Sequence, residues 1–175
     1  MNVPSSDVFQ LETERLILRQ LNESDADFIL ELVNDPDWIR YIGDRGIRTL
    51  GDASDYLNEG PLASYAQNGF GLWLVQLKDA TPIGMCGLIN REGLNDVDLG
   101  FAFMPTFRSQ GYAHESASIV IEYAKRSLEL KQLAAITDRD NAPSIKLLEK
   151  LGFQFEKMID LFEGEPAVNL FMLEL

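Results

Sequence analysis

The order in which strand-like and helix-like segments follow one another constrains this fold more than any other feature. Short apolar runs bounded by turn residues predict strands near residues 15–19, 70–77, 83–89, 97–103, 133–137, 153–161 and 168–175. Helical spacing predicts helices near residues 24–36, 52–67, 111–128 and 141–152. Neighbouring strands with short turns and two late helical crossovers predict an α+β fold, not a doubly wound one. Its sheet is expected to be mixed, mostly antiparallel and of about seven strands, with helices on both faces.

Several residues are expected to start or stop the early helices. Ser24 offers a cap for the first helix, with Asp27 three residues on, and Pro36 is expected to end it. The pair Gly60-Pro61 is expected to interrupt the second helix, and Gly69 to close it. The segment 37–43 between the two helices is too aromatic for a plain solvent loop.

The chain has 175 residues and no internal repeat or linker, which predicts a single domain over residues 1–175. A chain of this size buries about 70% of its extended surface on folding, so the core needs neither disulfide nor metal. The net charge of −13 argues against binding nucleic acid or an anionic membrane by bulk electrostatics. It leaves cationic partners as a weak suggestion.

A lone cysteine and a lone histidine restrict the chemistry further. Cys86 excludes an internal disulfide and a cysteine-based zinc cluster, and its apolar surroundings favour a buried thiol over a nucleophile. With His114 as the only histidine, no histidine-rich metal site or Ser-His-Asp triad is expected. The N-terminus lacks the pattern of a signal peptide, and no apolar run reaches 18 residues, which predicts a soluble, cytoplasmic protein.

The loop before the third predicted helix has features of an anion site. It reads Arg108-Ser109-Gln110-Gly111-Tyr112-Ala113, and its glycine lets a ligand approach the backbone closely. The first N–H groups of a helix are unpaired and lie at its positive end, which suits a phosphate. The same residues are also compatible with a plain strand-to-helix loop. No Gly-Lys-Ser/Thr follows, so the loop is not a P-loop.

A second loop, Asn141-Ala142-Pro143-Ser144, opens a helix that ends in Lys150-Leu151-Gly152-Phe153. A capped helix with a glycine stop accounts for these residues on their own. In order along the chain, however, RxxGxA, a strand, NxxS and KLGF resemble the acetyl-CoA-binding core of the GNAT superfamily of N-acetyltransferases. The segments LETERLILRQL and Tyr112-Ala113-His114-Glu115 resemble its Rim-type branch, which contains ribosomal-protein N-terminal acetyltransferases. The resemblance covers residues 11–173.

This resemblance implies a splay between the fourth and fifth predicted strands and a coenzyme A site around it. The pyrophosphate would bind backbone N–H groups of Arg108, Ser109, Gln110, Gly111, Tyr112 and Ala113. The pantetheine arm would pair in the gap with the strand Phe101-Ala102-Phe103, and Asn141 would contact the arm or its loop. Ser144 would lie near the thioester sulfur. Leu148 stands where many members carry a tyrosine acid, so Ser144 or water must protonate the departing thiolate.

The reaction implied is direct attack of a neutral amine on the acetyl thioester, which requires a proton acceptor. An α-amine is roughly 14% neutral at pH 7, whereas about one lysine side chain in 2,500 is neutral, so an α-amine needs only a modest base. The candidate bases are Glu163, ranked slightly ahead because the Rim-type branch can place an acid there, and Asp98. Each also reads as a solvated surface carboxylate.

Other residues have weaker candidate roles. Asp138 and Asp140 are expected to orient the loop before Asn141, and His114 to face phosphate or solvent. Three aromatic residues could line an acceptor pocket or belong to the core, namely Trp38, Tyr41 and Trp73.

The sequence therefore predicts an enzyme that transfers acetyl from acetyl-CoA to a primary amine, with a protein N-terminal α-amine favoured. A small-molecule amine (polyamine, amino acid or antibiotic) remains an alternative acceptor. A weakly catalytic acyl-CoA-binding module is another alternative. The chain is expected to be a monomer or homodimer. The Arg108 loop and its helix would provide a local positive site for coenzyme A, while the remaining negative charge could attract a cationic acceptor.

Overall fold

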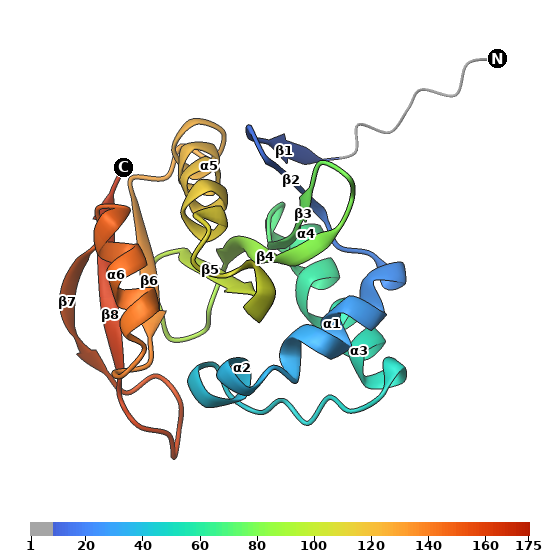
Figure 1. The fold of residues 1–175 in the computed structure, drawn as a ribbon. Helices are drawn as coiled ribbons and strands as arrows, with labels where there is room; N and C mark the ends of the chain where they lie inside the picture. The colour runs from blue at the N-terminus through green and yellow to red at the C-terminus, as the bar shows by residue number, and fades with distance from the viewer. Residues whose placement is uncertain (1–8) are drawn as a thin grey trace.

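A computed structural model describes residues 9–175 and contains one eight-stranded sheet (Figure 1). In spatial order its strands are β1 (Gln10–Glu12), β2 (Leu16–Gln20), β3 (Leu72–Leu77), β4 (Pro82–Ile89), β5 (Asp98–Phe103), β6 (Gln132–Thr137), β8 (Val168–Glu174) and β7 (Gln154–Ile159). Neighbours are antiparallel throughout this part of the chain, except β5 and β6, which are parallel. The predicted α+β class and mixed sheet are confirmed. The extra strand is β1, which is too short and too exposed to show a periodicity.

The helices form layers on both faces of the sheet. They are α1 (Ala26–Val33), α2 (Pro36–Tyr41), α3 (Leu50–Leu57), α4 (Ala63–Asn68), α5 (Tyr112–Arg126) and α6 (Ala142–Lys150), with 3-10 turns at Glu23–Asp25 and Pro105–Phe107. Figure 1 shows α5 across the sheet from α1 and α3. None of the helices in residues 9–175 is long and apolar enough to cross a membrane.

Alternation along the central strands produces the two cores that hold these layers. On β3, Trp73 and Val75 lie in one buried cluster with α5, whereas Leu74 lies in a second cluster with α1 and α3. On β4, Cys86 belongs to the first cluster and Met85 to the second. Because successive strand residues point to opposite faces, a nearly continuous apolar run supplies both cores.

The start of the first helix differs from the prediction, because Asn22 and not Ser24 is the cap. The Oδ1 atom of Asn22 accepts from the Ser24 N–H at 3.0 Å, and Oδ2 of Asp25 accepts from the Asn22 N–H at 2.9 Å. This capping box opens the short 3-10 turn that precedes α1. Asp25 is buried in that position because Arg19 pairs with it at 2.8 Å.

Pro36 does more than end the first helix, because it also begins the next one. It occupies the first turn of α2, where a missing N–H costs nothing. Asp35 caps this helix by accepting from the Trp38 N–H at 3.2 Å. The aromatic segment after Pro36 is therefore helical up to Tyr41. Farther along, the predicted interruption at Gly60-Pro61 is a π-helical turn over Asn58–Leu62, and Gly69 ends α4 at φ 75° as predicted.

The two halves of the sheet meet at only one point. Strands β5 and β6 pair only at Asp98 and Ala134, where the Ala134 N–H donates to the Val97 carbonyl at 2.9 Å. Beyond this pair β5 continues along β4, whereas β6 continues along β8. The predicted splay between the fourth and fifth expected strands is therefore confirmed, between β5 and β6.

Candidate functional site

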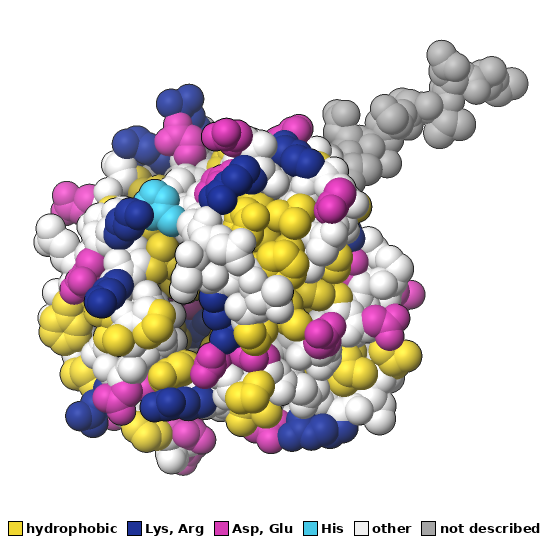
Figure 2. Space-filling view, viewed as in Figure 1, with side chains coloured by type: hydrophobic (Ala, Val, Ile, Leu, Met, Phe, Trp, Pro, Cys, Tyr) yellow, Lys and Arg dark blue, Asp and Glu magenta, His cyan; other side chains and the backbone are white. Residues whose placement is uncertain are grey.

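The divergence of β5 and β6 opens a cleft of about 1310 Å³ (Figure 2). This volume exceeds the roughly 300–1,000 Å³ typical of a pocket for one small ligand, so it has room for two reactants. Its walls come from β5, β6, the first turns of α5 and α6, α2 and the segment between β7 and β8. The predicted site residues that line it are Asp98, Phe101, Ala102, Phe103, Arg108, Ser109, Gly111, Ala113, His114, Asp138, Asn141 and Ser144.

Free backbone donors lie at the start of α5, where Ser109, Gly111 and Ala113 line the cleft but the predicted Gln110 and Tyr112 do not. The N–H groups of residues 109–113 have no acceptor among the described residues, whereas the Arg108 N–H donates to the Pro105 carbonyl at 3.2 Å. Left-handed backbone at Ser109 (φ 59°) and Gly111 (φ 85°) shapes the turn. These amides and the positive end of a 15-residue helix are a candidate anion site. Of the six N–H groups that the resemblance implied, that of Arg108 is already bonded.

The Arg108 side chain is turned away from this row of amides. Its Nε donates to the Phe103 carbonyl at 2.9 Å, and its two terminal nitrogens pair with Asp35 and Asp37. Two carboxylates thus more than offset its single positive charge. The positive potential of the loop therefore comes from the helix N-terminus, and Arg108 instead ties the loop to α2.

Arg15 holds the loop from the opposite side, a role that the sequence did not reveal. One terminal nitrogen donates to the Gln110 carbonyl at 3.0 Å, and Nε donates to Glu115 at 2.7 Å. The guanidinium also lies 4.4 Å from the ring centre of Tyr112. In a trans peptide the carbonyl and the next N–H point in opposite directions. Holding the Gln110 carbonyl therefore turns the Gly111 N–H away from Arg15.

Along β5, backbone groups face the gap at alternate residues. The Met104 N–H donates to the Ile83 carbonyl at 2.9 Å, which fixes which residues bond to β4. By alternation, the N–H and C=O groups of Leu99, Phe101 and Phe103 point away from β4. The Phe103 carbonyl already accepts a hydrogen bond from Arg108 Nε. Leu99 lies next to the single pair of β5 and β6, at Asp98 and Ala134. Phe101 is therefore the residue best placed to pair with an extended ligand in the cleft.

The first turn of α6 forms the opposite wall. Asn141 caps it as predicted, with its Oδ1 accepting from the Ser144 N–H at 3.3 Å. Before it, Asp138 accepts from the Asp140 N–H at 2.8 Å, which shapes the loop leading to the cap. One turn after Ser144, Leu148 is fully buried in the core and has no proton to give.

Asp98 lies at the closed end of the splay and is almost completely buried. Its Oδ2 accepts from Arg91 Nε at 2.7 Å, but its Oδ1 has no hydrogen-bond partner within residues 9–175. Burial raises the pKa of Asp98 to about 6, and Arg91 and the nearby Ile136 N–H only partly offset this effect. An unpaired buried acceptor costs about 1–3 kcal/mol, which marks this carboxylate as a candidate proton acceptor.

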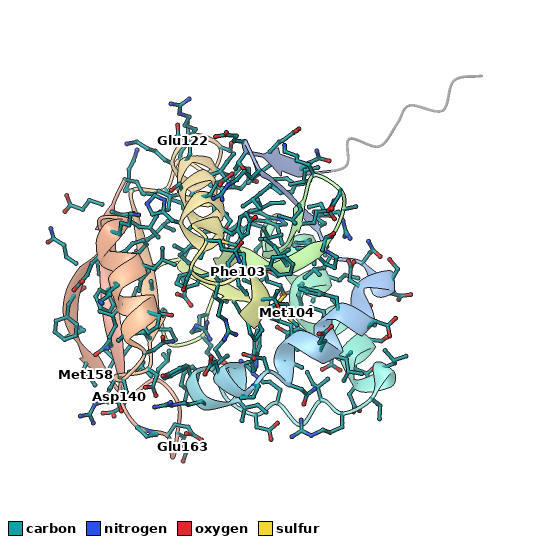
Figure 3. All side chains as sticks on the ribbon, in the orientation of Figure 1. Phe103, Met104, Glu122, Asp140, Met158 and Glu163 are labelled. Atoms are coloured by element: carbon teal, nitrogen blue, oxygen red, sulfur yellow. The ribbon has the colours of Figure 1, made fainter. Side chains whose placement is uncertain are left out.

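The structure does not bring Glu163 to the same place. It is exposed in the turn between β7 and β8, as Figure 3 shows, and it is not among the residues that line the cleft. The exposed Asp140, also labelled there, does not line the cleft either. The geometry therefore favours Asp98 over Glu163 as the base.

The remaining candidates divide between cleft and core. Trp38 and Tyr41 line the cleft, whereas Trp73 is buried and stacks on Phe9 at 4.7 Å between ring centres. Cys86 is fully buried, and burial raises its thiol pKa to about 12, so no reactive thiolate forms near neutral pH. No three His, Cys, Asp or Glu side chains gather to hold a metal in the described part of the chain.

Comparisons with known proteins agree with this geometry. Residues 15–154 match the family model described as an acetyltransferase (GNAT) domain. The uncharacterized N-acetyltransferase p20 of Bacillus licheniformis is 30% identical over 172 residues, which cover 94% of each chain. An acetyltransferase structure from Agrobacterium tumefaciens has a TM-score of 0.82 at 20% identity, covering 100% of this chain and 99% of that one. RimL, a ribosomal alpha-N-protein acetyltransferase solved in complex with coenzyme A, has a TM-score of 0.81 at 16% identity, with coverage of 95% and 98%.

Proposed function

The chain belongs to the acetyltransferase (GNAT) domain family, and on this premise we propose that it transfers acetyl from acetyl-CoA to a primary amine. The favoured acceptor is the α-amine of a protein or peptide N-terminus. The observation that carries the proposal is one cleft that joins free amides at the start of α5, an open β5 edge and a buried carboxylate with an unpaired oxygen.

The groups along the cleft match the parts of acetyl-CoA in the order in which the cofactor carries them. Amides 109–113 would hold the pyrophosphate, and the Phe101 peptide groups would pair with the pantetheine amides in the gap. In this arrangement the thioester would lie between β5 and the first turn of α6, near Ser144. A net charge of −13 does not prevent binding of this polyanion, because the helix N-terminus provides the local positive potential.

The chemistry needs one proton acceptor and one proton donor. As the amine nitrogen bonds to the acetyl carbon, the carbon–sulfur bond breaks and the amine loses a proton. Asp98 takes that proton, directly or through a water, because its pKa of about 6 leaves it ionised at pH 7. Ser144 or a water delivers a proton to the departing thiolate. Cys86 is too deeply buried for a covalent acetyl intermediate.

The choice of an N-terminal acceptor rests on proton chemistry and on the neighbours. An α-amine is roughly 14% neutral at pH 7, so a carboxylate base suffices, whereas a lysine side chain would need a stronger base. RimL, by its description, is an alpha-N-protein acetyltransferase, and its fold matches this one along nearly the whole chain.

The proposal is tested by measuring CoA thiol release from acetyl-CoA with a panel of amines that contains N-terminal peptides, free amino acids and polyamines. Peptide-dependent release is expected. Preferential release with a small amine would replace the peptide acceptor. Tight CoA binding without any amine-dependent release would instead favour an acyl-CoA-binding module.

Ser144→Ala is expected to lower turnover by about 10²-fold, the lower end of the range for proton transfer, with a smaller change in CoA affinity. Glu163→Gln is the matched control, since it removes an exposed carboxylate outside the cleft. Steady-state kinetics with saturating peptide measures both. Unchanged turnover in Ser144→Ala would assign thiolate protonation to water. A large loss in Glu163→Gln would restore Glu163 as the base.

Arg15→Gln is expected to raise the KM for acetyl-CoA about fivefold to tenfold, because charge-assisted bonds that hold the loop contribute about 1 kcal/mol at a half-exposed site. The acceptor KM should not change. Arg126→Gln is the control, since it breaks an exposed ion pair with Glu122 at the other end of α5 (Figure 3). Equal effects of the two variants would show that Arg15 stabilises the helix without positioning the loop.

A further inference from the structure

The mouth of the cleft carries large apolar side chains that water reaches. Ile39 on α2 and Ile42, the residue just after α2, are 37% and 44% exposed, and Phe162, between β7 and β8, is 42% exposed. All three line the cleft, although they come from segments more than 100 residues apart. The other exposed large apolar residues within residues 9–175, Leu50, Phe155 and Met158, do not line it. Half of these side chains thus line one cleft, which is a pattern of binding sites rather than of ordinary surface.

The apolar mouth, defined here as Ile39, Ile42 and Phe162, is connected to the buried carboxylate. The Arg91 guanidinium lies 5.9 Å from the Phe162 ring centre, and Arg91 Nε lies 2.7 Å from Asp98. These two steps keep the ring within roughly 10 Å of the carboxylate, the span of about three extended residues. The amides of α5 form a different part of the wall. Phe162, one residue of the apolar mouth, therefore lies toward the proposed acceptor end of the cleft.

The charges along the cleft limit what the acceptor can be. Four of its carboxylates already have arginine partners: Asp35 and Asp37 with Arg108, Asp44 with Arg48 and Asp98 with Arg91. Among the described residues, the lining carboxylates outside any ion pair are Asp138 and Glu165, and the corresponding cations are Arg40, Arg45, Lys146 and Lys150. Counted with Arg108 and with the partners Arg48 and Arg91, these side chains are six carboxylates and seven cations, so the formal charge of the cleft is close to zero although the chain as a whole is acidic. Such a cleft gives a polycation no electrostatic advantage.

We infer that the acceptor is a peptide N-terminus with an apolar side chain at its second or third residue, which binds in the apolar mouth while the α-amine lies at Asp98. This inference rests on the proposed function and names the acceptor class more closely. The near-zero charge of the cleft gives no attraction specific to a polyamine, and a free amino acid is too short to reach from Asp98 to Phe162. Burial of one leucine-sized side chain is the source of the selectivity.

The test compares peptides that share an N-terminal alanine and differ at residues two and three, with leucine, serine or lysine there. With saturating acetyl-CoA, kcat/KM for the leucine peptide is expected to exceed that for the serine peptide about 10-fold to 100-fold, mainly through KM. Ile42→Ser and Phe162→Ser should each reduce this ratio several-fold, and the double variant should bring it near one. Leu50→Ser, at a residue that is 49% exposed but outside the cleft, is the matched control and should keep the full ratio.

The outcomes separate the inference from the proposed function. Acetylation of the leucine and serine peptides at equal rates, or a ratio that survives in the double variant, would overturn the inference alone. Faster acetylation of a polyamine or of the lysine peptide would also overturn it. No acetylation of any peptide by protein that binds acetyl-CoA would overturn the proposed acceptor and the inference together.

Discussion

Gly111→Glu is expected to abolish binding of acetyl-CoA. The N–H of Gly111 lies in the middle of the free amides at the start of α5. The preceding carbonyl, that of Gln110, accepts a hydrogen bond from Arg15. A glutamate there adds a negative charge beside the site for the pyrophosphate. It also adds bulk, since even a Cβ would lie 3.1 Å from a terminal nitrogen of Arg15. The measurement is the rise in Tm on adding CoA, which should disappear, together with acetyltransferase activity.

The control must separate loss of the site from backbone strain. Gly111 has φ 85°, where a side chain costs about 1–2 kcal/mol in any protein. Gly69 has nearly the same backbone, φ 75° at the end of α4, and nothing lies within 4 Å of an added Cβ. Gly69→Glu should therefore lose similar stability but keep the full CoA-induced shift. A shift that persists in Gly111→Glu would show that the anion site is not at α5.

The sequence predicted the order of strands and helices because that order follows from local periodicity. Where it failed, a partner distant along the chain or an ambiguous local signal decided the outcome. The first helix begins from Asn22 because Asp25 returns the capping bond and Arg19 neutralises that buried carboxylate. Pro36 is equally compatible with the end of one helix and the start of another. The structure selects the second because Asp35 caps α2.

The same distinction between local signals and distant partners applies to the candidate site. The amides at the start of α5 could be predicted, because a glycine before an apolar-striped helix is a local signal. The environments of the charged side chains could not, because each depends on a contact across the fold. Arg108 pairs with Asp35 more than 70 residues away, and Arg15 bonds to Gln110 and Glu115 about 100 residues away. No spacing rule relates these positions.

Net charge gave the least information about the acceptor. A value of −13 describes the whole surface, whereas binding depends on the charges that remain unpaired in the cleft. The cleft pairs four of its carboxylates with three arginines, and the formal charge of the described residues there is close to zero. The acidic charge is thus located mostly outside the cleft, and it gives no reason to expect a polycationic acceptor.

Asp98→Asn is expected to lower kcat/KM for an N-terminal peptide by about 10²-fold to 10⁴-fold, the usual contribution of a general base. Asparagine keeps the size of the side chain and can still contact Arg91, but it cannot accept a proton. The KM for acetyl-CoA and the CoA-induced rise in Tm should not change, because the amides of α5 are intact. Asp98→Glu should restore part of the activity, which a purely structural role of Asp98 would not predict.

The pH profile provides the sharper test of the same role. Only the ionised carboxylate accepts a proton, and burial raises the pKa of Asp98 to about 6. Wild-type kcat/KM should therefore fall as pH drops through 6, whereas an ordinary surface carboxylate would stay ionised down to about pH 4. In Asp98→Asn the inflection near 6 should disappear, and only that of the amine, near pH 7.8, should remain. If the inflection persists in Asp98→Asn but is lost in Glu163→Gln, the base is Glu163, and the buried pair of Asp98 and Arg91 serves only to hold β5 at the closed end of the cleft.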